Sequence, residues 1–279
     1  MRPLRPVRFL AIVPLMLALA ACGDDDDAAD TSDGTTTSEA AGGDATAEAP
    51  DDLVSQGTLT ICSDTPYEPF EFEGPDGEQT GYDIDLLRAI AEDASLDVEV
   101  LDLPFDGILG TLAAGDCDVV ASAVTINDER AQQVDFSEPY FDADQSLLIR
   151  VADEAKYSSL ADLGGERIAV QAGTTGETYA NENKPEGAEI VSFEDADGIF
   201  GAMASGDVAA VLQDFPVNAY RATQDATLTV TETFPTGEQY GFAVAKDNQQ
   251  VLAFIDDGLA ALRADGRFDE IFATYFGEA

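Results

Sequence analysis

Hydrophobic and polar positions follow two alternating patterns from residue 53 onward. Short apolar or alternating runs, typical of β-strands, occupy residues 59–62, 98–100, 119–121, 168–170, 190–191 and 209–212. Between the strand-type runs, apolar residues recur at helical spacing, as Ile84, Leu87, Ile90 and Ala91 do. Strands that alternate with helices predict an α/β fold with largely parallel sheets.

The first 52 residues have a different pattern. Residues 1–21 contain Arg but no acid, and their apolar run, 9–21, is shorter than the ~20 residues that span a bilayer. A basic start, a short apolar run and small residues are typical of an export signal. Residues 23–52 contain many acids but no Lys, Arg or aromatic residue, so we expect residues 22–52 to form an acidic disordered tether.

The composition excludes several classes of function. The 279 residues include 56 Asp and Glu against 13 Lys and Arg, which gives a formal net charge of −43, and they include no His. This charge repels the phosphates of nucleic acids, so we expect no nucleic acid partner. The absence of His excludes a His-based catalytic triad and a His-ligated zinc site, and we expect no cofactor and no metal.

The end of the apolar run, Leu19-Ala20-Ala21-Cys22, resembles the lipobox of bacterial lipoproteins. The resemblance implies that a signal peptide of residues 1–21 is removed and that Cys22 becomes the acylated N-terminus. We therefore expect an extracytoplasmic lipoprotein that is anchored to the cell membrane by lipid rather than by a spanning helix.

The segment Gly81-Tyr82-Asp83-Ile84-Asp85-Leu86 resembles the signature of bacterial extracellular solute-binding proteins, family 3, the polar amino acid-binding subunits of ABC importers. The resemblance covers residues 53–276, and further segments occur in the family's order. These segments are 105–109, 125–130, 135–137, 173–175, 213–214, 268–271 and 275–276.

The family resemblance implies a periplasmic-binding-protein-like fold of type II, in which two α/β lobes are joined by a two-strand hinge and the ligand lies between them. One lobe would comprise residues 53–147 and 243–279, and the other residues 148–242. The implied partners are a free amino acid and an ABC transporter permease with a separate ATPase subunit.

Arg130 is the residue expected to bind the carboxylate of the ligand. Its planar guanidinium can hold a carboxylate by two parallel hydrogen bonds. It stands at the start of a predicted helix that Asn127 caps, where free N–H groups also favour anions. The resemblance assigns the same role to Arg130, and the hydroxyl and backbone of Thr125 would add to the grip. The alternative is a surface Arg that pairs with Asp128 or Glu129.

The other lobe is expected to contribute a turn and an acid. Gly173, Thr174 and Thr175 follow a strand and precede a helical stretch, so their N–H groups would point at the cleft. Asp214 follows the strand at residues 209–212, at the carboxyl end where open α/β sheets bind ligands. The resemblance implies that Asp214 pairs with the α-ammonium; a solvated loop Asp is the alternative.

Four residues are expected around the side chain of the ligand. By resemblance, Tyr67 and Phe105 sandwich its aliphatic part or stack on a cation, although each also suits an ordinary core position. Asp64 matches a position that contacts the distal polar group in relatives that bind basic amino acids or glutamine. Ala123 stands where several basic-amino-acid relatives have Ser, and its carbonyl would accept a hydrogen bond from an ammonium.

The charges of these residues favour a cationic side chain. Arg130 contributes one positive charge while Asp64 and Asp214 contribute two negative ones, so a basic amino acid neutralises the cleft and a neutral zwitterion does not. We therefore rank Arg, Lys, ornithine or His first. Glutamine is second because its amide suits Asp64, with Gln171 or Gln213 completing the hydrogen bonds, and an acidic amino acid is third.

Two further questions have alternative answers at the level of sequence. Export permits a disulfide between Cys62 and Cys117, but a parallel alignment of the strands beside them would separate the two, so free and bonded thiols both fit. The same fold hosts enzymes such as cyclohexadienyl dehydratase. If this chain were such a dehydratase, Asp64 or Glu68 would act as its general acid. Nothing marks either residue for that role, and we expect a binding protein with no catalytic residue.

Overall fold

The computed structural model describes residues 48–277. The predicted signal peptide, Cys22 with its predicted lipid, and most of the predicted tether lie outside the described residues. No helix within 48–277 is long and apolar enough to cross a membrane.

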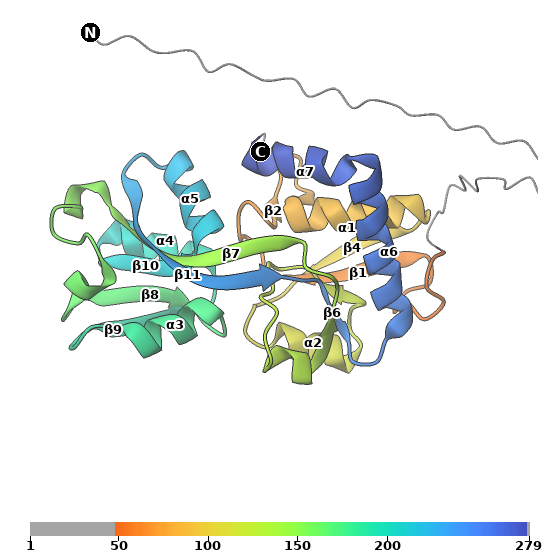
Figure 1. Ribbon diagram of the computed structural model, residues 1–279, viewed down its shortest axis with the longest axis horizontal. Coiled ribbons are helices and arrows are strands. Elements are labelled where there is room, and N and C mark those ends of the chain that lie inside the picture. Colours follow the sequence, from red (N-terminus) through yellow and green to blue (C-terminus); the bar gives the residue numbers. More distant parts are fainter. Residues whose placement is uncertain (1–47, 278–279) are drawn as a thin grey trace, which may run out of the picture. The chain divides into compact units, whose positions relative to one another are not determined.

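Residues 48–277 contain two five-stranded sheets. The first has the strand order β4-β1-β5-β12-β6, and we call this sheet and its helices the first lobe (Figure 1). Its strands are β1 (Thr58–Ser63), β4 (Asp97–Asp102), β5 (Val119–Val120), β6 (Val134–Phe136) and β12 (Ala243–Ala245). Its helices are α1 (Tyr82–Asp93), α2 (Ile108–Ala114), α6 (Gln249–Asp265) and α7 (Arg267–Phe276), and a small hairpin pairs β2 (Phe72–Glu73) with β3 (Gln79–Thr80). Strands β1, β4 and β5 are parallel, whereas β12 is antiparallel to both of its neighbours.

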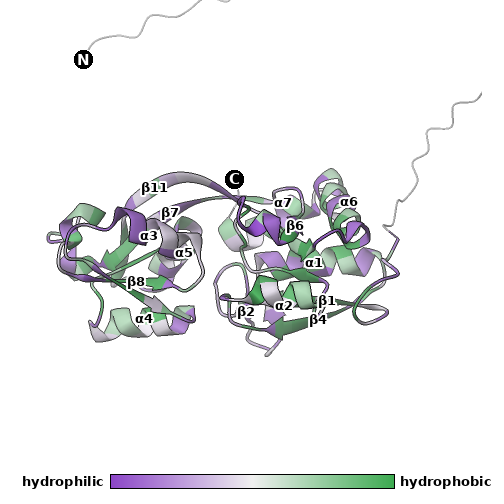
Figure 2. Cartoon of the chain, turned by 90° about the horizontal axis from the view of Figure 1, so that it is seen from below, coloured by the Kyte–Doolittle hydropathy of each residue, from purple (hydrophilic) through white to green (hydrophobic). Residues whose placement is uncertain are grey.

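The second sheet has the order β11-β7-β10-β8-β9, and with its helices it forms the second lobe. Its strands are β7 (Phe141–Arg150), β8 (Arg167–Gln171), β9 (Glu189–Phe193), β10 (Ala210–Asp214) and β11 (Leu228–Tyr240). Its helices are α3 (Thr175–Asn183), α4 (Ala196–Ser205) and α5 (Phe215–Gln224). Short 3₁₀ helices are η1 (Arg130–Gln132), η2 (Val151–Asp153) and η3 (Leu160–Leu163). In Figure 2 the inner strand β8 is coloured hydrophobic, in agreement with its buried residues.

The α/β architecture predicted from the apolar pattern is confirmed, and the strands that alternate with helices are parallel. The sheets are nevertheless mixed, because β7 is antiparallel to β10 and β11, and β12 is antiparallel to β5 and β6. These antiparallel strands are the segments that enter and leave the second lobe.

The two lobes are joined by the long strands β7 and β11, which run side by side and pair with each other (Figures 1 and 2). β11 ends at Tyr240, and β12 of the first sheet begins only three residues later, at Ala243. The backbone of Tyr140 donates a hydrogen bond to the carbonyl of Tyr240 at 3.0 Å, so the two crossings are linked at this end. The exact residues at which one lobe gives way to the other remain a prediction.

The cores of the two lobes differ in kind. In the first lobe the fully buried ring of Phe70 has its centroid 5.0 Å from that of Phe141 and 5.2 Å from that of Tyr240. Phe141 and Tyr240 are ends of the crossing strands, so this aromatic cluster fixes both strands where they leave the first lobe. Such aromatic pairs contribute about 0.5–1.5 kcal/mol each beyond the burial of their area. The second-lobe core is mainly aliphatic, with Leu147 and Ile168 fully buried.

The signature segment at residues 81–86 has a structural function. Gly81 has φ 128°, and a Cβ there would lie 2.1 Å from the carbonyl oxygen of Phe70, so only Gly fits this start of α1. Asp83 is fully buried and accepts hydrogen bonds from the backbone N–H of Ala123 at 2.9 Å and from the hydroxyl of Tyr140 at 2.6 Å. Asp83 thereby holds Ala123 in its left-handed backbone conformation, with φ 45°. The motif therefore shapes the loop after β5.

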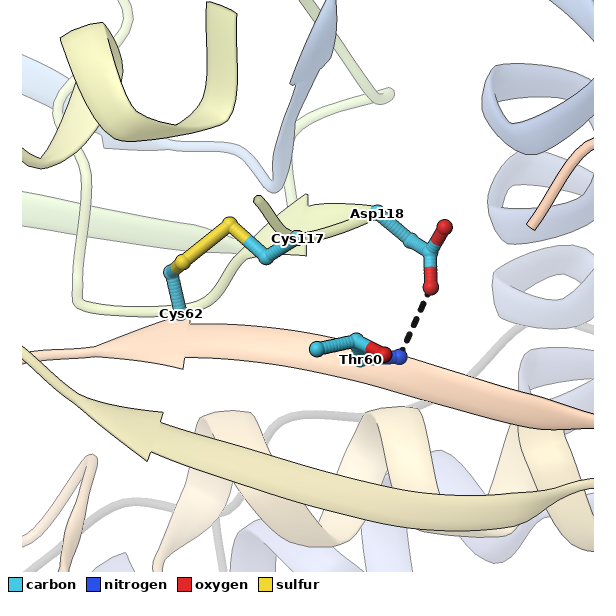
Figure 3. The surroundings of a disulfide bond; sticks show 4 residues. All are labelled: Thr60, Cys62, Cys117 and Asp118. Atoms are coloured by element: carbon cyan, nitrogen blue, oxygen red, sulfur yellow. Dashed lines mark hydrogen bonds between the residues drawn. A yellow bond between two sulfur atoms is a disulfide. The ribbon is translucent and has the colours of Figure 1, made fainter. Parts of the chain in front are cut away.

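Cys62 and Cys117 form a disulfide in the structure, with their Cα atoms 5.9 Å apart (Figure 3). The strands that hold them are direct neighbours, with Cys62 opposite Val120. Cys117 lies in the turn before β5, and that turn brings it back toward Cys62, which removes the separation that a simple parallel alignment suggested. Beside the bond, a carboxylate oxygen of Asp118 accepts a hydrogen bond from the backbone N–H of Thr60 at 2.8 Å.

Candidate ligand-binding site

A small cavity lies between the two lobes. Its lining consists of Asp64, Tyr67, Phe105, Ser122, Ala123, Thr125, Arg130, Gln171, Thr174, Thr175 and Asp214. The structure thus brings together the residues that the sequence selected for ligand binding, with two exceptions. Gly173 lines the adjoining surface hollow, and the side-chain amide of Gln213 instead donates to Asn218 at 2.9 Å. The cavity also includes Ser122, which the sequence did not indicate.

Arg130 reaches the cavity from the first lobe and is 8% exposed. The side chain of Asn127 accepts a hydrogen bond from the backbone N–H of Arg130 at 2.9 Å, as expected of a cap. The helix predicted here is only the three-residue 3₁₀ helix η1, because the chain turns into β6 at Val134. The guanidinium donates to the carbonyl of Thr125 at 2.9 Å and to that of Gly173 at 3.2 Å. A guanidinium has five N–H donors, so others remain for a ligand.

The guanidinium of Arg130 also lies over the ring of Phe105, with its central carbon 5.2 Å from the ring centroid. Burial lowers the pKa of Arg130, while the negative charges of Asp214 and Glu238 raise it. Because a guanidinium is not deprotonated in proteins, the group keeps its positive charge at neutral pH. The first lobe therefore presents one fixed cation that is backed by an aromatic ring.

Asp214 reaches the cavity from the second lobe, at the carboxyl end of β10, and is 7% exposed. It accepts hydrogen bonds from the side-chain amide of Gln145 and from the hydroxyls of Tyr67 and Tyr240, the bond from Tyr67 being 3.0 Å long. Burial raises the pKa of Asp214 to about 6, and the charge of Glu238 adds to this rise. The three hydrogen bonds oppose the rise but do not cancel it. The alternative for Asp214, a solvated position in a loop, does not fit this burial.

Asp64 follows directly after β1 and faces the second lobe. It is 5% exposed, and Nε2 of Gln171 donates a hydrogen bond to its carboxylate across the cleft. Burial raises the pKa of Asp64 to about 7, and the charges of Asp102 and Asp195 act in the same direction. A buried carboxyl with this pKa loses its proton to solvent when a cation binds beside it, because the cation favours the charged form.

The turn before α3 is less free to bind an anion than its sequence suggested. The backbone N–H of Gly173 donates to Glu177 at 2.9 Å, and the carbonyl of Gly173 accepts from Arg130. Thr174 caps α3, since its hydroxyl oxygen accepts from the N–H of Glu177 at 3.1 Å. The hydroxyl of Thr175 bonds to Glu238 at 2.6 Å.

The floor of the cavity is held by two buried acids that the sequence did not mark as part of the site. Glu71 accepts a hydrogen bond from the hydroxyl of Ser122 at 3.0 Å, and that hydroxyl accepts one from the backbone N–H of Asp64 at 3.1 Å. Asp83 holds Ala123 as described above. Burial raises the pKa of Glu71 well above its ordinary value and that of Asp83 to about 7, so at neutral pH the pair does not carry two full charges.

Three further residues that sequence reasoning missed contact the site from the crossing strands, namely Gln145, Glu238 and Tyr240. Gln145 and Tyr240 are buried, whereas Glu238 is half-buried. The nearest signal in the sequence is the lobe boundary expected between residues 242 and 243. No group of three or more Cys, Asp or Glu suited to a metal ion occurs in the described part of the chain.

Two α/β lobes that enclose a small, charged cavity at a two-strand hinge define a solute-binding protein of the type II periplasmic fold. The chain belongs to the bacterial extracellular solute-binding proteins, family 3, whose family model matches residues 59–278.

Known proteins with similar sequences and structures support this assignment. The L-cystine-binding protein TcyJ of Escherichia coli is 29% identical over 224 residues, which are 80% of this chain and 84% of that protein. The ABC transporter arginine-binding protein 1 of Escherichia coli is 32% identical over 215 residues, 75% of this chain and 87% of that protein.

Among solved structures, the ancestral amino acid-binding protein AncCDT-1, a precursor of cyclohexadienyl dehydratase, is 37% identical. It superposes with a TM-score of 0.74 and covers 79% of this chain and 96% of its own. These two Escherichia coli relatives are named as binding proteins, and this chain is likewise a binding protein rather than an enzyme.

Proposed function

We propose that this chain is the extracytoplasmic binding subunit of an ABC importer and captures an amino acid with a cationic side chain. The observation that carries the proposal is the charge of the cavity. Arg130 is the one cationic side chain in its lining, whereas Asp64 and Asp214 line it and Glu238 contacts two of the lining hydroxyls. A zwitterion adds no net charge, whereas a side-chain cation offsets the excess of carboxylates.

The ligand would bridge the two lobes. Its carboxylate would bind the guanidinium of Arg130, and its α-ammonium would bind Asp214 in place of the hydroxyl proton of Tyr67. The rings of Tyr67 and Phe105 would flank the aliphatic chain, and the distal cation would reach Asp64. Because groups from both lobes are needed at once, the ligand would stabilise the closed arrangement by its differential affinity for it.

The proposed transport role extends to the parts of the chain outside the described residues. A lipid on Cys22 would hold the protein at the outer face of the membrane, and the acidic tether over residues 22–52 would give the lobes reach. The loaded form would deliver its amino acid to a permease driven by a separate ATPase. The arginine-binding protein among the relatives is named as part of an ABC transporter, which supports this role.

Glutamine is the second candidate, and a specific contact favours it. In the structure Asp64 already accepts a hydrogen bond from the side-chain amide of Gln171. The amide of a glutamine ligand would make a bond of the same kind. Gln171 would then lose its bond to Asp64 and keep the one to the carbonyl of Glu194, which is 3.1 Å long.

A thermal-shift screen of the twenty amino acids with ornithine and citrulline tests the proposal, because a ligand of the folded state raises the unfolding temperature. We expect the largest shifts from arginine, lysine, ornithine or histidine. Arginine against citrulline is the sharpest pair, since the two differ mainly in charge. A citrulline shift equal to that of arginine contradicts the charge argument, and a shift from glutamine alone establishes the second candidate.

A further inference from the structure

Glu238 lies on the crossing strand β11 and contacts both lobes at once. Its Oε2 accepts hydrogen bonds from the hydroxyl of Thr125 in the first lobe at 2.9 Å and from the hydroxyl of Thr175 in the second lobe at 2.6 Å. Its Oε1 accepts a third from Nε2 of Gln145 on β7 at 3.1 Å. One carboxylate therefore ties together both lobes and both crossing strands.

Other hydrogen bonds also cross the cleft, but a ligand would compete for them. They join Tyr67 to Asp214, Gln171 to Asp64, and Arg130 to Gly173. Each involves a charged group that the proposed ligand needs. The bonds to Glu238 differ, because the contacts proposed for the ligand, to Arg130, Asp214 and Asp64, use neither of the two Thr protons that Glu238 accepts. These bonds are compatible with an occupied cavity.

The backbone around Glu238 is fixed to the first lobe. The carbonyl of Gln239 accepts from the N–H of Ile126 at 2.8 Å, and Tyr240 forms an isolated bridge with Thr125. The pairing of β11 with β7 is irregular between Phe234 and Glu238, which re-aims the side chain at this point. The carboxylate then reaches across to Thr175, the first residue of α3, where the partial positive charge of the helix favours an anion.

We propose that Glu238 is a positioning residue that latches the closed form and slows release of the ligand, an inference that rests on the proposed capture of an amino acid between the lobes. Opening the lobes separates Thr125 from Thr175, so one carboxylate oxygen can no longer bond to both. The bonds therefore stabilise the closed form and not the open one. Hydrogen bonds to an ionised acceptor are about twice as strong as neutral ones, which makes a single residue sufficient.

The test compares Glu238→Ala and Glu238→Gln with the control Glu232→Gln in the full-length protein. Glu232 is on the same strand and carries the same charge, but it bonds within the second lobe, to the N–H of Leu160 at 2.7 Å. Association and dissociation of radiolabelled L-arginine are measured for each variant. We expect dissociation from Glu238→Ala to be about ten-fold faster or more, with association changed less than about two-fold. Glu238→Gln should fall between it and the wild type, and Glu232→Gln should match the wild type.

Tighter binding by Glu238→Ala overturns the proposal, since it would mean that Glu238 competes with the ligand for the Thr hydroxyls. Dissociation that is unchanged in both Glu238 variants overturns it equally. A role only in folding would lower the unfolding temperature and alter both rate constants together, which the rate measurements distinguish.

A second measurement separates this proposal from the identity of the ligand. In ligand-free protein, amide hydrogen exchange at residues 122–125 and 173–175 reports how often the cleft opens. We expect Glu238→Ala to accelerate exchange in both segments and to leave the lobe cores unchanged. If wild type fails to bind arginine but this acceleration is seen, the substrate class is wrong and the latch stands. If exchange in the cleft is unchanged, the latch is wrong whatever the ligand.

Discussion

The two lobes contribute unequally to the cavity. The first lobe supplies Arg130, Asp64 and both flanking rings from a body that is stiffened by a disulfide and an aromatic cluster. The second lobe supplies Asp214, Gln171 and two Thr residues from a mainly aliphatic core. The stiffer lobe therefore carries most of the groups that would recognise a side chain, and the other lobe completes the site by closing over them. Rigid support for recognition groups lowers the cost of ordering them on binding.

Loss of the disulfide should have the largest effect on the difference in stability between the two lobes. Cys62 and Cys117 are 55 residues apart in sequence, and closing a loop of that length stabilises the fold by about 4 kcal/mol in the chain-entropy model. We expect Cys62→Ala with Cys117→Ala to lower the free energy of unfolding by about 2–4 kcal/mol in urea titrations. Hydrogen exchange should rise in the first lobe and not in the second. Equal loss of protection in the two lobes would show that their stabilities are not separate.

Removal of the first-lobe cation should have the next largest effect. Truncating one member of a buried charge pair costs roughly 2–5 kcal/mol, so we expect Arg130→Ala to weaken amino acid binding by about 100-fold or more in calorimetry. Arg150→Ala is the matched control, because Arg150 is a partly buried second-lobe Arg that pairs with Asp153 at 2.7 Å away from the cavity. Binding by Arg130→Ala with near-native affinity would show that the clamp is assigned to the wrong residue.

Asp64 should decide which side chain the first lobe accepts. We expect Asp64→Asn to weaken arginine binding by about ten-fold or more, because a neutral amide cannot balance a buried guanidinium. Glutamine binding should change less, since an amide can pair with an amide. Arginine and glutamine titrations of the same two proteins measure the ratio. An unchanged ratio places the distal group of the ligand elsewhere.

The pH dependence of binding provides the finest comparison. Burial raises the pKa of Asp64 to about 7 and that of Asp214 to about 6. Below these values the carboxyls are protonated in the empty protein, so affinity for a cationic ligand should fall by about five-fold between pH 8 and pH 6.5. Binding near pH 6.5 should release protons to the buffer.

The stability of the empty protein should change with pH in the opposite direction. Both acids have pKa values above the ordinary 3.8, so their ionisation costs more in the folded chain than in the unfolded one. Their contribution to stability is full below about pH 4 and is lost as the pH rises through 6 and 7. Thermal unfolding over a range of pH, with and without arginine, checks both the predicted rise of affinity and the predicted fall of stability with pH. The same pH slope in both samples would contradict the proposed contact between ligand and Asp64.

Local pattern predicted several strands and helices, whereas the family resemblance supplied most of the candidate site. The run at residues 59–62 became β1, and the helical spacing of Ile84, Leu87 and Ile90 became the buried face of α1. Arg130 and Asp214 were recognised because a resemblance supplied positions that local chemistry made sensible. Their meeting in one cavity agrees with that prediction, while their ligand-binding roles remain proposals.

The parts that sequence reasoning missed depend on contacts between distant segments. Glu238 bonds to Thr125 and Thr175, which are 113 and 63 residues away along the chain. The helix expected at Arg130 shrank to one 3₁₀ turn because β6 pairs with β12, more than a hundred residues later. No periodicity within either segment contains this information.

The sequence by itself determined the α/β class, the absence of His chemistry and a large excess of acid, because these follow from residue types and local spacing. Only the tertiary structure decided the disulfide, the burial that shifts Asp64 and Asp214, and the convergence of both lobes on Glu238. Charge and hydrogen-bond energies depend on distance and on exclusion of water, and both are set only once remote segments pack together.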